Sequence, residues 1–395
     1  MAKSNIIIQF ICYSPRIYSG FDKYNLVLAR ILKMKGYKSV FVFSDSIEVQ
    51  PIVDDLKAED VTIELISTKN RITIFRDVVR LFFKHKPVIV HAHFDNFIQL
   101  ITAFLSLIFG SRYFTSFHSI ISLLTISEYR KKKGLAKQVL LRLYYRFLVE
   151  TSVNVFCISN AIKDQFRTFS GSDSSKIKCL YLGVNMNPNI KSKEQLRSYL
   201  SLPYDNVLLC NVSAIEYIKG VDILIKAVDL LKHQFHLTDF KCCHIGGVRS
   251  ETNENIIYRE ELLSQVKELH LENEFLWLGH RNDIDELLSA FDIYVHPSRM
   301  EGLSVAIMEA CTQSLPAVGT RTGGIPEIIH EDNNGFLFSP ESAKELAGFL
   351  NELIQDKELR EKMGKESFRI VEENFNIETQ TKILAVSYIA AVKEY

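Results

Sequence analysis

The alternation of short apolar runs with longer stretches of helical periodicity is the feature that most restricts the fold of this 395-residue chain. Runs of about four to eight apolar residues predict buried strands, and apolar residues recurring every three or four positions predict helices. Such an alternation predicts a parallel sheet covered by helices on both faces. The strands expected in the first half are 6–13, 39–43, 88–91, 113–117, 153–158 and 178–182, with helices near 24–35, 74–84 and 96–109.

A second series of the same kind follows residues 185–193, which lose apolar periodicity and are predicted to be a linker. Its expected strands are 207–212, 241–245, 275–278, 293–296, 317–319 and 335–338, with helices near 221–232, 259–269, 284–290, 304–311 and 325–329, and one or two more over 368–395. We therefore expect two doubly wound α/β domains, 1–188 and 189–370, followed by a C-terminal helix in 371–395. Ligands of such sheets bind beyond the carboxyl ends of the strands, in loops expected to face an interdomain cleft.

The charge is divided unevenly between the two halves. The composition, 47% hydrophobic and 24% charged, is that of a globular protein, and the formal net charge is +0. Residues 1–190 nevertheless hold 26 Lys and Arg against 14 Asp and Glu, and the rest hold 21 against 33. The basic half suits anionic lipid, a polyanion or a phosphorylated acceptor, although attraction between the halves explains the same division.

Cysteine usage and hydropathy indicate a cytoplasmic protein without a membrane span. The seven cysteines are odd in number and lack framework spacing, and Cys242 and Cys243 lie in an apolar run, which favours buried thiols in a reducing compartment. The apolar start is interrupted by Gln9 and is predicted to be a first strand rather than a signal peptide. The longest apolar run, 97–109, is shorter than the roughly 20 residues that a spanning helix needs.

The sharpest motif follows the strand expected to end at His296. A loop leads from there to a helix that begins near Ser304, whose hydroxyl can cap it. The amide groups of Gly302, Leu303 and Ser304 are expected to point outward. Together with the helix dipole, such amides favour the binding of a phosphate.

Two carboxylates flank this predicted anion site. Glu301 lies in the loop, and Glu309 lies about two turns along the helix on a similar face. Each can accept hydroxyl hydrogen bonds, one from a sugar and one from a ribose. From the spacing alone, a capping carboxylate and an exposed helix glutamate remain the simpler interpretation.

The wider pattern resembles the retaining glycosyltransferases of family 4. Glu301 and Glu309 stand within a His-Pro-Ser-x-x-Glu-Gly-Leu-Ser frame, followed by Thr-Gly-Gly-Ile-Pro-Glu at 322–327 and Asn-Gly-Phe-Leu-Phe at 334–338. The resemblance covers nearly the whole chain. It implies the GT-B fold, in which two Rossmann-like domains face each other across a cleft and the last helix returns to the N-terminal domain. It also implies that Glu301 binds the donor sugar and Glu309 the ribose.

The resemblance assigns the donor diphosphate partly to Lys219. The family carries an Arg and a Lys in the loop after the first strand of the second domain, and both bind the diphosphate. Lys219 matches the Lys, but Ala214 occupies the Arg position. Arg249 or Arg281 could supply the missing charge. Without the family pattern, Lys219 is an ordinary solvated lysine before a helix.

Two positions of the first domain also match the family. Ser19 and Gly20 stand where the family has a Gly-Gly loop, a partial match in which Gly20 lets the backbone approach the diphosphate. His118 resembles the strand-end histidine that reaches the donor sugar, where a neutral imidazole can accept a hydroxyl hydrogen bond or stabilise developing charge. By itself, His118 is better explained as structural. A metal site on His91 and His93 is also conceivable, but we favour two histidines that cap a strand.

Two further pairs of residues complete the set of candidates. Asp283 and Asp285 are similar to the acidic pair that holds a metal in the other major glycosyltransferase fold. We prefer helix capping, since carboxylates favour the positive end of the helix dipole, and we expect no metal. Gly279 and His280, at a predicted strand end, are candidates for the wall around the nucleotide base.

The segment from Arg130 to Arg146 predicts a helix with one apolar and one basic face. We favour contact with an anionic membrane surface, to which each basic residue contributes about 1 kcal/mol, over a core-packed helix with a solvated basic face. The apolar residues 120–126 could receive a lipid-linked acceptor. No nucleic-acid recognition motif occurs, and no dinucleotide fingerprint, Walker loop or His-Glu-x-x-His sequence, so nucleic-acid binding, dehydrogenase, NTPase and metalloprotease functions are disfavoured.

The sequence thus predicts a hexosyltransferase that moves a sugar, with retention, from a nucleotide-diphosphate sugar to a glycan or polyprenyl-linked acceptor. No other cofactor and no essential metal is expected. We expect it to act in bacterial surface polysaccharide synthesis. We expect it to be located in the cytoplasm, or on the inner face of the membrane. A non-catalytic sugar-nucleotide-binding partner, suggested by Ala214 and Ser19, and a sugar-nucleotide epimerase remain alternatives.

Overall fold

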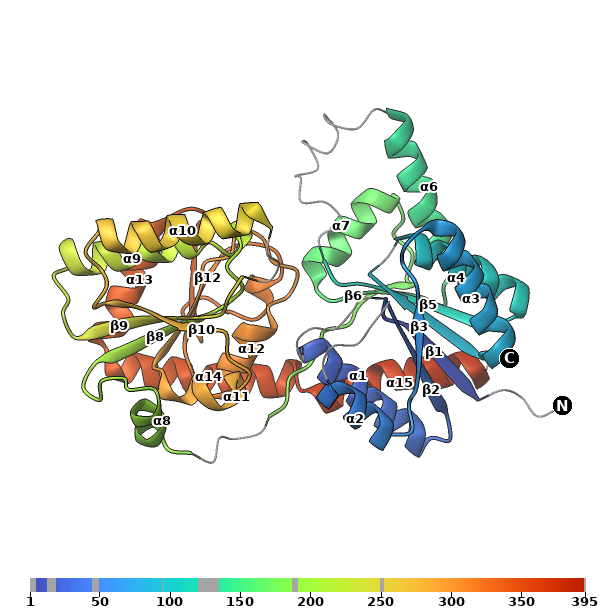
Figure 1. The fold of residues 1–395 in the computed structure, drawn as a ribbon, viewed down its shortest axis with the longest axis horizontal. Helices are drawn as coiled ribbons and strands as arrows, with labels where there is room; N and C mark the ends of the chain where they lie inside the picture. The colour runs from blue at the N-terminus through green and yellow to red at the C-terminus, as the bar shows by residue number, and fades with distance from the viewer. Residues whose placement is uncertain are drawn as a thin grey trace. The chain divides into compact units, whose positions relative to one another are not determined.

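The structure is a computed structural model that describes residues 5–12, 19–44, 50–94, 96–119, 135–186, 191–248 and 252–393. It contains two compact units, each an α/β fold around a parallel sheet (Figure 1). Unit 1 comprises Met1–Gly183 and Ile377–Tyr395, and unit 2 comprises Val184–Asn376.

Unit 1 contains a seven-stranded parallel sheet in the order β3-β2-β1-β4-β5-β6-β7. The inner strands are buried on both faces, which is why they read as continuous apolar runs in the sequence. The strands are β1 (Ile6–Phe10), β2 (Lys38–Ser44), β3 (Thr62–Ile66), β4 (Ile89–His93), β5 (Arg112–Phe117), β6 (Asn154–Cys157) and β7 (Ile177–Cys179).

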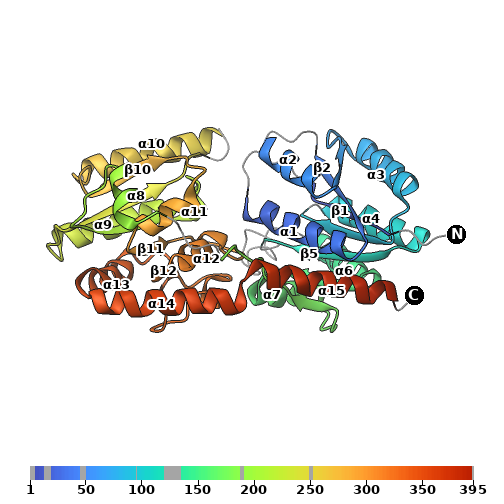
Figure 2. The same ribbon diagram turned by 90° about the horizontal axis from the view of Figure 1, so that it is seen from below.

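The helices of unit 1 cover both faces of this sheet. The strand order reverses direction after β3, and because such crossovers are right-handed, the connecting helices α3, α4, α6 and α7 lie on the face opposite α1 and α2. The C-terminal helix α15 packs beside α1, and Arg112 Nε donates to the Ala391 carbonyl at 3.0 Å (Figure 2). The helices are α1 (Gly20–Met34), α2 (Gln50–Ala58), α3 (Arg71–His85), α4 (Asn96–Phe109), α6 (Leu135–Thr151), α7 (Asn160–Ser170) and α15 (Ile377–Lys393).

Unit 2 contains a six-stranded parallel sheet in the order β10-β9-β8-β11-β12-β13. The strands are β8 (Val207–Val212), β9 (Phe240–Ile245), β10 (Phe275–Gly279), β11 (Ile293–His296), β12 (Ala317–Thr320) and β13 (Gly335–Phe338). Its helices and 3₁₀ turns are α8 (Lys193–Tyr199), η1 (Tyr217–Lys219), α9 (Val221–His233), α10 (Asn253–Glu268), α11 (Ile284–Leu287), η2 (Leu288–Ala290), α12 (Val305–Thr312), η3 (Ile325–Glu327), α13 (Ala343–Gln355) and α14 (Lys357–Asn374). The predicted pair of parallel-sheet α/β folds is confirmed.

Several elements differ from the prediction. The sequence reading missed β3, a partly exposed strand at the sheet edge whose alternating residues lack an apolar run, and it missed α2, α7, α8 and α13. The helix expected over 325–329 is the 3₁₀ turn η3, with a proline in its first turn. The predicted linker ends where α8 begins at Lys193.

Two further predictions can be compared with the structure. Cys157, Cys210, Cys242, Cys243 and Cys311 are buried free thiols, as expected, whereas Cys12 and Cys179 are only partly buried. Across the part of the chain that the structure describes, no helix combines the length and the apolar composition needed to cross a bilayer.

Candidate functional site

An ion pair between Lys219 and Glu301 lies at the centre of the candidate site in unit 2. Strand β8 ends at Val212, and the loop after it forms η1, which carries Lys219. Glu301 lies in the loop between β11 and α12. The two strands are neighbours in the sheet, and Lys219 Nζ lies 2.7 Å from Glu301 Oε2. Because parallel strands end at one edge, two groups 82 residues apart in the sequence meet there.

Two glycines allow the surrounding loops to approach so closely. Gly220 has φ of +68°, and a Cβ there would lie 2.1 Å from the Pro297 carbonyl oxygen. Gly323, at φ +51°, would place a Cβ 1.7 Å from the carbonyl oxygen of Glu301. Only glycine fits either position without moving the backbone. The Glu301 loop is thereby held from both sides.

His296 is a second partner of Glu301. Its Nε2 lies 3.1 Å from Glu301 Oε2, and the Ser298 hydroxyl lies 3.5 Å from the same oxygen. Burial alone raises the pKa of Glu301, but the His296 hydrogen bond and the Lys219 charge outweigh it and bring that pKa to about 2. Burial lowers the pKa of His296, so a neutral imidazole donates its Nε2 proton to an ionised carboxylate.

Arg299 holds the η1 turn in place, and the sequence analysis missed it. Its guanidinium donates to both oxygens of Asp222, at 2.8 and 2.9 Å, and also pairs with Glu341. It lies 3.9 Å from the Tyr217 ring centroid and donates to the Tyr217 carbonyl at 2.7 Å. The Arg299 amide binds the Ile218 carbonyl as well. The sequence signals this contact only through the presence of an arginine in the loop after β11 and of an aspartate, Asp222, in the first turn of α9.

The start of α12 differs from the expectation by one residue. Ser304 caps the helix, as predicted, by accepting a hydrogen bond from the Ile307 amide at 3.3 Å. Its backbone is extended, so the helix begins at Val305 and the first-turn amides belong to the residues after Ser304 rather than to Gly302 and Leu303. The Leu303 side chain is buried. Glu309 lies in the second turn of α12 and is partly buried.

Gly279 and His280 lie at the same edge of the sheet but farther along it. Strand β9 separates β10, which ends at Gly279, from β8. The Gly279 carbonyl accepts the Gly246 amide at 2.8 Å, and both Gly279 and His280 are exposed. The structure therefore does not bring these two residues into the Lys219–Glu301 cluster.

The expected helix cap at Asp283 is only partly correct. Asp283 is the N-terminal boundary residue of α11, but its side chain makes no capping hydrogen bond. Its carboxylate instead binds Arg281, at 2.9 and 2.7 Å, and Arg281 also donates to the Tyr199 hydroxyl. The guanidinium of Arg281 is thus engaged by Asp283 and Tyr199, and Arg249 lies outside the described residues.

In unit 1, His118 lies in a cluster of aromatic rings. Its Nε2 is 2.9 Å from His93 Nδ1, and its ring stacks on Phe94 at 4.3 Å and meets the edge of Phe21 at 4.7 Å. Burial lowers the pKa of His118 to about 3, so its imidazole is neutral at physiological pH. Gly20 is the first residue of α1, next to Phe21, so the two predicted positions of unit 1 are neighbours.

The remaining histidines of the strand end are explained by hydrogen bonds. His91 contacts the Tyr388 hydroxyl through Nδ1 and the Ser116 hydroxyl through Nε2 at 2.8 Å. The rings of His91 and His93 lie 4.1 Å apart, on one face of β4, as residues two apart in a strand must. Within the described ranges, no group of three or more His, Cys, Asp or Glu is placed to hold a metal.

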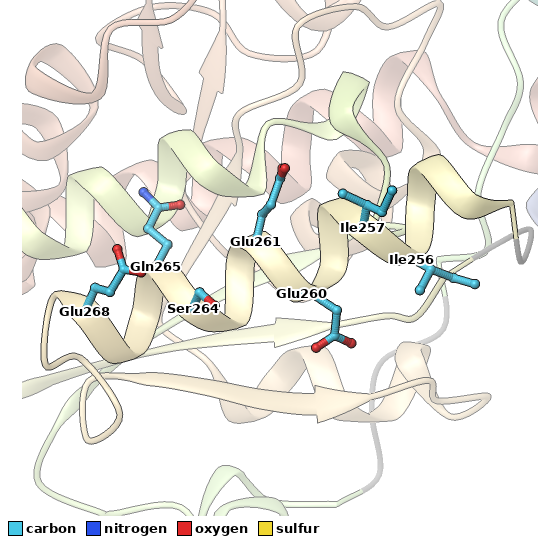
Figure 3. A pocket seen from close by; sticks show the side chains of 7 residues that line it. All are labelled: Ile256, Ile257, Glu260, Glu261, Ser264, Gln265 and Glu268. Atoms are coloured by element: carbon cyan, nitrogen blue, oxygen red, sulfur yellow. The ribbon is translucent and has the colours of Figure 1, made fainter.

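The predicted membrane helix corresponds to α6, which begins at Leu135. Residues 120–126 and 130–134 lie outside the described residues. A surface depression elsewhere, on unit 2, is lined by α10 residues alone, among them Ile256, Ile257 and Glu260 (Figure 3). None of its lining residues belongs to the clusters described above.

Comparison with known proteins identifies the family. The model for glycosyl transferases group 1 matches residues 192–369, and the model for glycosyltransferase family 4 matches residues 18–187. The chain belongs to the group 1, family 4 glycosyltransferases. The expected resemblance is therefore confirmed, and the two matched segments correspond to the two α/β folds.

Sequence relatives of this glycosyltransferase chain match it over part of their length. One is N-acetyl-alpha-D-glucosaminyl L-malate synthase of Bacillus anthracis, 34% identical over 117 residues, which are 30% of this chain and 31% of that protein. Another is spore coat protein SA of Bacillus subtilis (strain 168), 28% identical over 240 residues, 58% of this chain and 62% of that protein. The aligned segments thus span less than two thirds of these relatives.

Solved structures share the fold over nearly the full length. HepE of Anabaena in complex with UDP superposes with a TM-score of 0.81 at 20% identity, covering 98% of this chain and 100% of that one. The same protein in complex with UDP-glucose gives a TM-score of 0.80 at 21% identity, covering 98% and 99%. These similarities establish the GT-B fold.

Proposed function

We propose that this glycosyltransferase moves a hexose from a nucleotide-diphosphate sugar to a glycan or polyprenyl-linked acceptor, with retention at the anomeric carbon. The observation that supports it most is the Lys219–Glu301 pair at the carboxyl edge of the unit 2 sheet. Edges of this kind bind nucleotides in open α/β folds. The pair also supplies one cation for a leaving phosphate and one acceptor for sugar hydroxyls.

In this proposal Lys219 and the start of α12 stabilise the departing diphosphate. The Lys219 side chain is 20% exposed, so its ammonium is accessible yet poorly screened. First-turn amides add donors that favour the charge growing as the glycosidic bond breaks. A diphosphate also competes with Glu301 for the ammonium, which leaves Glu301 to accept sugar hydroxyls. No metal is assigned to this step.

Retention is proposed to occur by substitution on one face of the sugar, without a covalent glycosyl-enzyme. Glu301 is the carboxylate nearest to Lys219 in the motif, and its pKa of about 2 shows a charge held by two donors. Such a carboxylate is a weak nucleophile and a good hydrogen-bond acceptor. His118, neutral because desolvation lowers its pKa, is assigned a hydrogen bond to the donor sugar, and Glu309 one to the ribose.

The donor to test first is a UDP-sugar, since the HepE crystals hold UDP and UDP-glucose. The purified protein is incubated with UDP-, GDP- and ADP-hexoses, with and without a polyprenyl-phosphate lipid extract. The anomeric configuration of the product is read by NMR. A new glycolipid or glycan with the donor's configuration supports the proposal, and an inverted product contradicts it.

Glu301→Gln provides the matched test of the site. It keeps the shape of the side chain but removes the charge, and we expect transfer to fall about 100-fold, the range for loss of one preorganised contact. Glu345→Gln, at an exposed position in α13, serves as the control and should leave transfer unchanged. Equal turnover by the wild type and Glu301→Gln would remove Glu301 from the mechanism.

Two alternatives give different products in the same assay. Ala214, where the family has an arginine, favours a non-catalytic partner that binds the donor, which would yield no product. A sugar-nucleotide epimerase would return an isomerised donor without any acceptor. Surface polysaccharide synthesis is proposed as the setting because the acceptor class and the basic unit 1 fit it.

A further inference from the structure

Helix α4 presents an apolar face to solvent. The helix contains no charged residue, and it packs against β4 and β5. The opposite side carries Leu100, Phe104, Leu107 and Ile108, whose spacing places them in one stripe. They are 39, 53, 59 and 62% exposed, and every exposed residue of α4 in the described part of the chain is apolar. Contact with water alone does not account for such a face.

Helices α3 and α6 both pack beside α4 (Figure 1), and their exposed apolar residues extend this face. The Phe83 ring of α3 lies 5.1 Å from the Phe109 ring of α4. On the other side, the Tyr144 hydroxyl of α6 donates to Gln99 Oε1 of α4 at 2.8 Å. We call the combined face the α3–α4–α6 surface. Its exposed apolar residues are Ile72, Phe75 and Phe83 of α3, the four residues of α4, and Val139, Leu140 and Leu143 of α6.

Basic side chains flank the α3–α4–α6 surface on both sides. Helix α3 carries exposed Arg76 and Arg80, and α6 carries exposed Arg142 and Arg146. The acidic residues in these three helices are Asp77, which is buried and pairs with Arg76, and Glu150 near the end of α6. The surface is therefore an apolar strip between two cationic margins.

We propose that the α3–α4–α6 surface docks this glycosyltransferase onto an anionic phospholipid bilayer. An apolar face with basic margins is the pattern of helices that lie in the membrane interface, where apolar side chains enter the acyl boundary and arginines bind lipid phosphates. A symmetric dimer through the same surface would bring arginines of both copies together, which disfavours that occupant. This proposal deepens the proposed function, because a polyprenyl-linked acceptor resides in the bilayer.

The assignment differs from the one that the sequence suggested. The basic segment from Arg130 to Arg146 shares only α6 with the proposed surface. The apolar contribution comes mainly from α4, which has no charge and was predicted only as a strand-covering helix. The docking surface is thus built by three helices from 71–85, 96–109 and 135–151.

Flotation with vesicles tests the proposal without any need for turnover. Vesicles contain equal parts of phosphatidylglycerol and phosphatidylcholine, or phosphatidylcholine alone. We expect the wild type to float with the anionic vesicles, and a Phe104→Ser, Leu107→Ser, Ile108→Ser variant to lose at least tenfold in partitioning. The three residues are exposed, so the fold should survive, which circular dichroism verifies.

A matched control exists on α10 of unit 2. Ile256, Ile257 and Leu263 are 40, 57 and 39% exposed, and Figure 3 shows the first two on the surface of that helix. An Ile256→Ser, Ile257→Ser, Leu263→Ser variant removes the same kind of residue, and it should float like the wild type. Arg80→Glu with Arg146→Glu should reduce binding to anionic vesicles about tenfold or more, since each basic residue near such a surface contributes about fivefold.

A fluorescent probe reports insertion directly. The chain has one tryptophan, Trp277 in β10, so Trp277→Phe gives a dark background. In that background, Leu107→Trp should shift its emission to the blue on adding anionic vesicles and be quenched by brominated lipid. Ile257→Trp in the same background should show neither effect.

Three results would overturn the proposal. The first is that the wild type does not float with anionic vesicles. The second is that the α4 variant floats as well as the wild type does. The third is that the wild type is a dimer in lipid-free solution and the α4 variant is a monomer. Donor hydrolysis or transfer to a soluble acceptor is measured on the same samples. A protein that floats but transfers no sugar refutes the proposed function alone, and one that transfers sugar but does not float refutes only the docking surface.

Discussion

Lys219 Nζ and Glu301 Oε2 lie 2.7 Å apart, and each group is the counter-charge of the other. The loops that bring them together leave β8 and β11, adjacent strands of one parallel sheet. This pair predicts how stability depends on pH, because the pKa of Glu301 is depressed from 4.5 to about 2 in the folded chain.

A depressed carboxyl pKa stabilises the folded state above the unfolded pKa, and this stability is lost as the pH falls toward the folded pKa. For Glu301 the window runs from pH 4.5 to 2, and the contribution at neutral pH is about 3 kcal/mol. We expect Glu301→Gln to lower the free energy of unfolding at pH 7, and we expect this deficit to fall to roughly half by pH 3 and to vanish as the pH falls through 2. Urea titrations at both pH values measure this. A deficit that stays constant with pH would contradict it.

Gly323→Ala should both destabilise the chain and reduce transfer. Its Cβ would overlap the Glu301 carbonyl oxygen, and φ of +51° is strained for alanine, so we expect a loss of about 2 kcal/mol or more. Gly348→Ala is the control, since it lies in α13 with no atom within 4 Å of a new Cβ, and it should stabilise by roughly 0.5–1 kcal/mol. Thermal melts compare the two, and a neutral Gly323→Ala would show that the Glu301 loop can move freely.

Arg299→Lys should raise the KM for the donor and leave the overall fold intact. A lysine cannot hold both oxygens of Asp222 and stack on Tyr217, so the η1 turn carrying Lys219 loses its support. Arg369→Lys is the control, because its pairs with Glu366 and Glu373 are exposed to solvent and contribute little to stability. Steady-state kinetics at a series of donor concentrations measure the KM of both variants and of the wild type. Equal KM values for Arg299→Lys and the wild type would exclude a positioning role.

His118 should remain neutral throughout the physiological range. Burial lowers its pKa to about 3, so protonation begins only well below the usual histidine range, and the unfolded chain binds this proton more readily. Nitrogen-15 spectra of labelled histidine should show neutral His118 shifts from pH 8 to 5, with His118→Asn identifying the resonance. A titration midpoint near 6.5 would refute the buried, neutral imidazole.

The sequence by itself determined the two parallel sheets and the position of the sharpest motif. Strands such as β8, β11 and β13 are buried on both faces, so they appear in the sequence as apolar runs. The cap of α12 is also local, because Ser304 accepts a hydrogen bond from the amide of Ile307, three residues later. Edge strand β3 escaped detection because only some of its side chains are buried.

Tertiary structure alone decided which charges meet. Lys219 pairs with Glu301, and Arg299 pairs with Asp222, because the neighbouring strands β8 and β11 end at one edge, a relationship that spacing along the chain does not encode. His296 and Glu301 are only five residues apart, and they meet where β11 passes into its loop. The apolar face of α4 likewise became visible only when its other side was seen packed on the sheet. Periodicity reports which side of an element is apolar, but contact between distant elements sets what that side faces.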